Sequence, residues 1–185
     1  VLGSIAGEAL GICQCHEHLM LGKGEGYYIN SDLCMDDREK SEEEVRRFRR
    51  AGGTTLIDAQ PLGCCRMEEG LCEIAGRTGA RIIASTGFHK RAFYPACHWL
   101  FGKSEKELQS LFEDEIFQGM YVECDEGFSG RQIGRKAGIV KIALEDSDCL
   151  RAGRHLFTAA IRAAVHGEKS LLVHTEPDSP VREFL

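Results

Sequence analysis

The chain has 185 residues, of which 43% are hydrophobic and 28% charged, and its formal net charge is −6. This composition fits one globular domain with a real core, and the acidic balance argues against nucleic acid or an anionic membrane as the main partner. No apolar run approaches the roughly 20 residues that a membrane-spanning helix needs.

Nine cysteines are many for this length, but their odd number and their spacing do not indicate a short disulfide scaffold. Together with the strand–helix alternation described next, they favour a reducing, cytoplasmic setting with free thiols. We expect most of them to be small core residues. For Cys13 with Cys15, and for the adjacent Cys64 and Cys65, metal binding or oxidation stays open.

The first half of the chain opens with a short strand at residues 12–15 that ends at His16. A glycine-rich segment at 22–26 follows, which we interpret as a mobile loop. A Ser41–Glu44 capping box then predicts the start of a helix that the glycines at 52–53 stop. The β-branched run at 54–58 is the second predicted strand, and a helix over about 67–78, closed by Gly79, comes next.

The second half continues the same alternation. Residues 81–86 predict a third strand, and a long loop at 88–103 either carries function or is a surface excursion anchored by Phe93 and Trp99. A Ser104–Glu107 capping box opens a helix that runs to about residue 118. Strands at 138–143 and 170–174 flank an alanine-rich helix over 151–166, whose His155 and His166 we assign no function.

Such alternation is typical of βαβ units with a parallel sheet and right-handed crossovers. A doubly wound open sheet and a closed barrel both fit. No G-x-G-x-x-G spacing follows the first strand, so a dinucleotide site of the doubly wound type is not indicated.

Three segments place candidate metal-binding side chains at or near predicted strand ends. Taken singly, polar residues at a strand end and a hydrogen-bonded core histidine are the alternatives. His16 and His18 are two residues apart, so in a strand both imidazoles project to one face. His174 ends the fifth predicted strand, and Lys141 lies inside the apolar fourth strand. An ammonium buried there must be neutral, paired or chemically altered, which leaves a Schiff-base nucleophile, a general base, a carbamate that bridges metals, or a side chain that snorkels to the strand end. Catalytic groups gather at the carboxyl ends of the strands in a (β/α)₈ barrel.

These segments resemble the phosphotriesterase family of the amidohydrolase superfamily. The resemblance is carried by Gly11–Leu19 with its H-E-H-L signature, by Gly52–Asp58, by Ser85–Phe88, by Ala137–Ala143 and by Val173–Glu176, in the family's order. It implies a (β/α)₈ TIM barrel, of which this chain would supply roughly the first five βα units as one domain, truncated at its C-terminus.

The resemblance also implies a binuclear metal centre. His16 and His18 would bind the more buried ion, and His174 the more exposed one. A Lys141 carbamate derived from CO₂ would bridge the two ions, which makes Lys141 a catalytic residue as well as a metal ligand. The ions would be Zn²⁺, with Mn²⁺, Co²⁺ or Fe²⁺ as alternatives, and a hydroxide that bridges them would attack the substrate. The family's further ligands, a sixth-strand His and an eighth-strand Asp, would lie beyond residue 185.

We therefore expect a zinc-dependent hydrolase that acts on a small lactone, another carboxylic ester or an organophosphate triester. Candidate substrate-binding residues are Tyr28, His89 and Trp99, with Tyr27 beside them. We expect no nucleic-acid or membrane partner, and a homodimer stays open. Two rival functions remain, a lysine Schiff-base lyase on a similar barrel and a non-catalytic or incomplete protein of the same fold.

Overall fold

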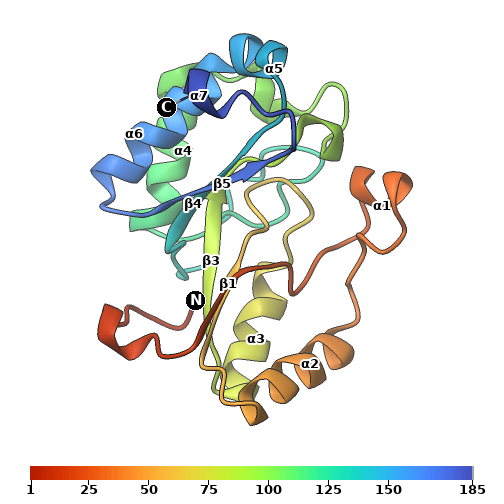
Figure 1. The fold of residues 1–185 in the computed structure, drawn as a ribbon, viewed down its shortest axis with the longest axis vertical. Helices are drawn as coiled ribbons and strands as arrows, with labels where there is room; N and C mark the ends of the chain where they lie inside the picture. Colours follow the sequence, from red (N-terminus) through yellow and green to blue (C-terminus); the bar gives the residue numbers. More distant parts are fainter. Residues whose placement is uncertain (185) are drawn as a thin grey trace.

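The computed structural model describes residues 1–184, apart from the side chain of Cys149, and Figure 1 shows the arrangement of its elements. In chain order these are η1 (Gly7–Ala9), β1 (Cys13–Glu17), α1 (Glu25–Ile29), α2 (Arg38–Arg50), β2 (Thr55–Asp58), α3 (Glu68–Thr78), β3 (Arg81–Gly87), η2 (Arg91–Phe93), η3 (Trp99–Gly102), α4 (Glu105–Phe117), β4 (Ile139–Leu144), α5 (Ser147–Ala152), α6 (Arg154–His166), β5 (Leu171–Thr175) and α7 (Val181–Phe184).

The five strands form one sheet in the order β1-β2-β3-β4-β5, so each strand lies beside the next one in the chain. All four pairings are parallel. Sequential parallel pairing with helical crossovers is the arrangement of a (β/α)₈ barrel, whereas a doubly wound sheet changes direction within its strand order. The predicted fold, five βα units of a TIM barrel, is therefore confirmed.

The helices cover one face of the curved sheet in two groups, which Figure 1 shows below and above the strands. In the first group, Val45 of α2 and Leu71 and Ile74 of α3 pack with Leu56 of β2 and Ile82 of β3. In the second, α4 and α6 pack against each other and against the residues of β4 and β5 that face the helices, namely Val140, Ile142, Leu144, Leu171 and Val173. Because side chains alternate along a strand, Lys141 and His174 face the opposite, inner side of the sheet.

Two predicted helix ends are confirmed by the geometry of their caps. The side chain of Ser104 accepts from Glu107 N while the Glu107 carboxylate accepts from Ser104 N, which is the predicted capping box. Gly79 closes α3 in the left-handed conformation, with a φ of 68°, and its N–H donates to Ala75 O. Glycine adopts this conformation without the steric cost that a side chain brings.

Three local predictions were wrong. Helix α2 begins at Arg38 rather than near Ser41, because the carboxylate of Asp37 accepts from Lys40 N and caps it one turn earlier. The helix predicted over 151–166 is two helices, α5 and α6, which meet at Gly153. The glycine-rich segment interpreted as a mobile loop enters α1, a short helix that begins at Glu25.

A buried ionic network fixes the segment that follows β2. The guanidinium of Arg66 is fully buried and donates to both carboxylate oxygens of Glu115, at 2.6 and 3.3 Å, and to Glu68 Oε1 at 3.0 Å. It also donates to the carbonyls of Ser85 and Tyr121. Five donated hydrogen bonds satisfy the charge of a buried Arg, and they tie the loop after β2 to β3 and α4.

Eight cysteines are described, and all eight are free thiols. Only Cys64 and Cys124 of these eight are buried, while Cys15 and Cys97 are exposed and the others intermediate. The expectation that most cysteines are core residues was therefore wrong. None of the described helices combines the length and the apolar composition that crossing a bilayer requires.

Candidate active site

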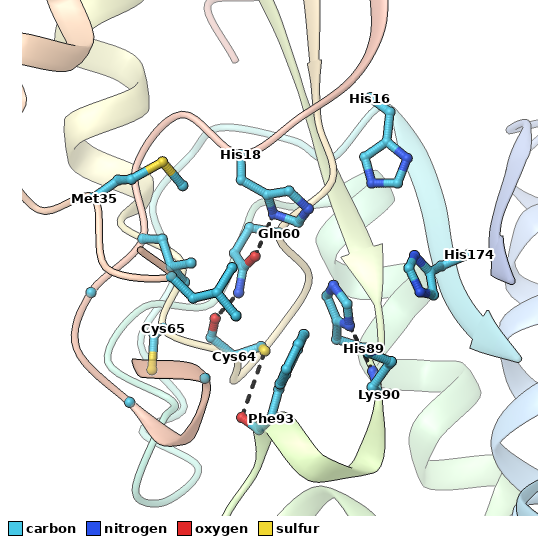
Figure 2. A pocket seen from close by; sticks show the side chains of 15 residues that line it. His16, His18, Met35, Gln60, Cys64, Cys65, His89, Lys90, Phe93 and His174 are labelled. Carbon is cyan, nitrogen blue, oxygen red and sulfur yellow. Dashed lines mark hydrogen bonds between the residues drawn. The ribbon is translucent and has the colours of Figure 1, made fainter. Parts of the chain in front are cut away.

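A cavity of about 290 Å³ opens at the carboxyl ends of the strands on the inner side of the sheet. Figure 2 shows four imidazoles along one side of it, those of His16, His18, His89 and His174. Its other side is mostly apolar. The remaining lining residues are Leu21, Gly22, Gly24, Gly26, Leu33, Met35, Gln60, Cys64, Cys65, Lys90 and Phe93.

The imidazoles come from three strands that are far apart in the sequence. The ring centroids of His16 and His18 are 5.5 Å apart, and those of His16 and His174 are 6.4 Å apart. His89, just after β3, is 5.7 Å from both His18 and His174. The structure thus brings together the three histidines that the sequence marked as metal ligands, and it adds His89 between two of them.

The ring of His18 is held in one orientation by Gln60. Gln60 Oε1 lies 2.6 Å from His18 Nδ1, and an amide oxygen only accepts, so the proton is on Nδ1 and Nε2 carries the free lone pair. Gln60 is itself anchored, because its Nε2 donates to Cys64 O and its backbone N donates to Asp58 Oδ1. Burial, followed by the charge of Lys141, lowers the pKa of His18 to about 4, so this imidazole is neutral at physiological pH.

Lys141 is fully buried, and it lies close enough to His18 and His89 for its charge to help lower the pKa of both imidazoles. Its Nζ donates to Ala59 O at 3.2 Å, and the described residues give it no ion-pair partner within 4.0 Å. Desolvation lowers the pKa of Lys141 to about 8, against the opposing effect of Cys64 and Asp58 nearby. Asp58 does not compensate fully, since its own burial raises its pKa to about 6 and its oxygens accept from Leu19 N and Gln60 N.

His174 has a carboxylate partner. Its Nε2 lies 3.1 Å from Glu176 Oε1, and Glu176 also pairs with Lys90 at the edge of the cavity. Hydrogen bonds from Lys90 and then His174 lower the pKa of Glu176 to about 2. Because an ionised carboxylate accepts only, His174 Nε2 carries a proton and donates to Glu176, so Nδ1 is the ring nitrogen that this bond leaves available.

These side chains suit a divalent cation in their chemistry. Within residues 1–184, no three His, Cys, Asp or Glu side chains form by themselves a group that could hold a metal ion. However, metal ligation needs neutral, oriented imidazoles, and His18 and His174 each have an outer partner that fixes the tautomer. The buried, poorly compensated Lys141 amine would become an anionic ligand as a carbamate. The donor set therefore fits a metal centre that includes Lys141.

The comparison with known families decides the membership of the chain. A family model described as "Phosphotriesterase family" matches residues 1–182. The chain belongs to the phosphotriesterase family. The resemblance predicted from the strand motifs is thereby confirmed.

Relatives within and around the phosphotriesterase family agree with this assignment. The chain is 31% identical over 186 residues to a phospho-furanose lactonase of Mycoplasmopsis agalactiae, covering 95% of this chain and 51% of the relative. It superposes on an amidohydrolase of Mycoplasma synoviae with a TM-score of 0.79 at 28% identity, covering 90% of this chain and 48% of that one. For a lactonase of Listeria monocytogenes the TM-score is 0.77 at 25% identity, covering 94% and 55%. The chain thus spans about half the length of these proteins.

Two of the residues predicted to bind substrate lie away from the cavity lining. Tyr28 is 73% exposed on α1, where it contacts the ring of Tyr27. Trp99 packs on Phe128, and its Nε1 donates to Cys124 O at 2.7 Å. It therefore anchors the long loop, as the interpretation of that loop as a surface excursion expects. His89, the third predicted residue, lines the cavity.

Gln60 and the apolar wall were missed by the sequence reasoning. Gln60 carried a usable signal, because it follows the second predicted strand at the same carboxyl edge as the histidines. Leu33 and Met35, in the apolar wall, carried no such signal in the sequence. They line the cavity because an antiparallel bridge between Leu21 and Met35 holds their segment there.

Proposed function

We propose that this chain supplies the metal-binding front half of the active site of a hydrolase that cleaves a small lactone, another carboxylic ester or a phosphotriester. His16 and His18 would hold one divalent ion, His174 a second, and a carbamate on Lys141 would join the two sites. Zinc is the first candidate, because imidazole suits it, and Mn²⁺, Co²⁺ and Fe²⁺ are alternatives.

The state of Lys141 is the observation that carries this proposal. A fully buried ammonium without an ion pair is costly, and its pKa of about 8 makes the neutral amine accessible near physiological pH. A neutral amine adds to CO₂ and releases a proton, which gives an anionic carbamate. That anion would be compensated by cations held on the three neighbouring histidines, whereas the ammonium has no such partner.

The residues of the chain divide the remaining work. The two ions, when bound, would supply electrophilic activation of the substrate and a nucleophilic hydroxide near neutral pH. Gln60 orients His18 and Glu176 orients His174, so that both imidazoles offer a fixed lone pair. Leu33, Met35 and Phe93 form an apolar wall that would receive the part of the substrate that does not react.

Lactones are the first substrate class to examine, because two of the relatives carry that activity in their names. A phosphotriester fits the same electrophile chemistry and the family name. We propose small molecules as the partners, with a homodimer left open.

The lysine Schiff-base alternative is disfavoured by the position of Lys141. A Schiff base needs the substrate carbonyl to reach Nζ, but Lys141 is fully buried and is not part of the cavity lining. Carbon dioxide is small enough to reach the buried Lys141 amine, whereas a larger carbonyl substrate is not.

The experiment is a hydrolysis panel of lactones, carboxylic esters and phosphotriesters run on the purified full-length protein. We expect turnover in at least one class, its loss after removal of metal with a chelator, and its return with Zn²⁺ or Mn²⁺. Borohydride trapping of a substrate on Lys141, with activity indifferent to chelator, would establish the lyase instead. Bound metal without any turnover would establish the non-catalytic alternative.

A further inference from the structure

His89 differs from the other cavity imidazoles in the nitrogen that is already engaged. The backbone N–H of Lys90 donates to His89 Nδ1 at 2.7 Å, and Figure 2 marks this bond. A nitrogen that accepts a hydrogen bond carries a lone pair and no proton. A doubly protonated ring is excluded for the same reason, because its Nδ1–H would face the Lys90 N–H. The one proton of the ring is therefore on Nε2.

This tautomer separates His89 from the metal ligands. His18 has its proton on Nδ1, which faces Gln60, and so presents a lone pair at Nε2. His89 presents an N–H at that same far position. Coordination through His89 Nε2 would require loss of the only ring proton, which neutral imidazole ligands do not undergo. His89 can thus donate to a molecule in the cavity but is unsuited to bind a metal ion there.

The placement of His89 directs this donor to the centre of the site. Its ring lies 5.7 Å from both His18 and His174, and Figure 2 shows it reaching into the space between them. The ring packs on Phe93 at 4.7 Å, and the backbone N of His89 donates to the Tyr94 hydroxyl at 2.9 Å. The residue is only 5% exposed, so its orientation is fixed before any substrate binds. A preorganised donor of this kind stabilises developing negative charge well, because no reorganisation is needed during the reaction.

We propose that His89 is a catalytic hydrogen-bond donor, whose Nε2–H binds the substrate oxygen on which negative charge develops during hydrolysis. The inference rests on the proposed function and deepens it. No proton is transferred from His89, since the N–H remains intact and only the hydrogen bond strengthens as charge accumulates on the oxygen. The substrate class is one with a carbonyl or phosphoryl oxygen, which lactones, esters and phosphotriesters share.

The tautomer is tested without any substrate. A long-range proton–nitrogen NMR spectrum of protein labelled with ¹⁵N-histidine distinguishes an imidazole protonated at Nε2 from one protonated at Nδ1. The His89 signals are assigned by their disappearance in His89→Phe. We expect the Nε2–H pattern for His89 and the Nδ1–H pattern for His18. An Nδ1–H pattern for His89 would overturn the proposal.

The catalytic role is tested with two substitutions of opposite character. His89→Phe keeps a planar ring but removes the donor, and kcat should fall about 100- to 1,000-fold, the usual effect of removing one such donor. KM should change little, because the donor acts on charge that develops after binding. His89→Gln places an amide N–H near the Nε2 position and should recover part of the lost kcat. Metal content measured by elemental analysis should equal that of the wild type in both variants.

The matched control is His98→Phe. His98 lies in the same loop, is 4% exposed, and contacts Tyr94, Trp99 and Phe101 rather than the cavity. Its replacement should leave kcat near the wild-type value, and thermal melts of all three variants exclude misfolding as the cause of any loss.

The outcomes separate the two proposals. Turnover by the wild type with an unchanged kcat in His89→Phe would overturn the donor role alone. A loss of metal in His89→Phe would make His89 a ligand and overturn the donor role as well. If the wild-type protein hydrolyses none of the substrates in the panel, the proposed hydrolase function is contradicted, and with it the catalytic role of His89.

Discussion

Replacement of Gln60 by Leu should weaken metal binding at the site that includes His18. The two side chains have similar length and shape, but Leu cannot accept from His18 Nδ1 or donate to Cys64 O. Gln60 is 2% exposed, so its hydrogen bond to His18 is shielded from bulk solvent. His18 would be left with an unpaired N–H and a ring free to rotate.

The magnitude follows from two independent considerations. Removing the outer hydrogen-bond partner of a metal-binding His costs about 10- to 100-fold in metal affinity, which is about 1.4 to 2.7 kcal/mol. Leaving a buried N–H without an acceptor costs about 1 to 3 kcal/mol. Since both describe the loss of the 2.6 Å contact between Gln60 and His18, they apply to one effect and are not added.

The assay is competition for Zn²⁺ between the purified protein and a fluorescent chelator. In Gln60→Leu, the dissociation constant of the Zn²⁺ ion bound through His18 should rise about 10- to 100-fold, while that of the other ion stays the same. Gln60→Glu keeps the hydrogen-bond acceptor and should bind Zn²⁺ at least as tightly as Gln60→Leu. Gln132→Leu is the matched control, because it removes an amide that donates to Gly119 O far from the cavity. A Gln60→Leu protein that melts normally and binds both ions with wild-type affinity would refute the role assigned to Gln60.

Two other predictions concern stability. Glu115→Ala should lower the free energy of unfolding by about 3 to 5 kcal/mol, because it leaves the Arg66 guanidinium buried without its main counter-charge. Chemical denaturation measures this free energy, and a loss below about 1 kcal/mol would contradict the prediction. Hydrogen bonds from Ser104, and then Lys103, lower the pKa of Glu107 to about 2 from an ordinary value of 4.5. The capping box therefore stabilises the fold fully above the ordinary value and loses this contribution as pH falls toward 2. The stability difference between wild type and Glu107→Gln should shrink with acidification, and a difference that stays constant from about pH 5 to about pH 3 would contradict the cap's ionic character.

The sheet and the placement of the candidate metal-binding residues were predictable because both follow from strong local patterns. Buried parallel strands are continuous apolar runs, and a charged residue inside one, such as Lys141, or imidazoles at its end, such as His16 and His18, break the pattern visibly. The order of these strands along the chain then brings His174 to the same edge, since sequential parallel strands all end on one side.

The details that failed depend on contacts that a local pattern does not contain. Both Asp37 and Ser41 can cap a helix, and in the structure it is the Asp37 carboxylate that does so, by accepting from Lys40 N. Trp99 and Tyr28 are aromatic residues in loops, and only tertiary packing decides that one anchors the loop and the other faces solvent. The tautomer of His89 depends on one backbone hydrogen bond, which no spacing predicts.

The most direct test of the account is elemental analysis of the purified protein beside its Lys141→Ala variant, with anomalous diffraction to locate any ion. We predict about two divalent ions per chain in the wild type, lying among His16, His18, Lys141 and His174, and a marked loss in Lys141→Ala that short carboxylic acids partly restore. Equal metal content in the two proteins, or ions bound away from these four residues, would contradict the claim that a modified Lys141 joins the metal sites.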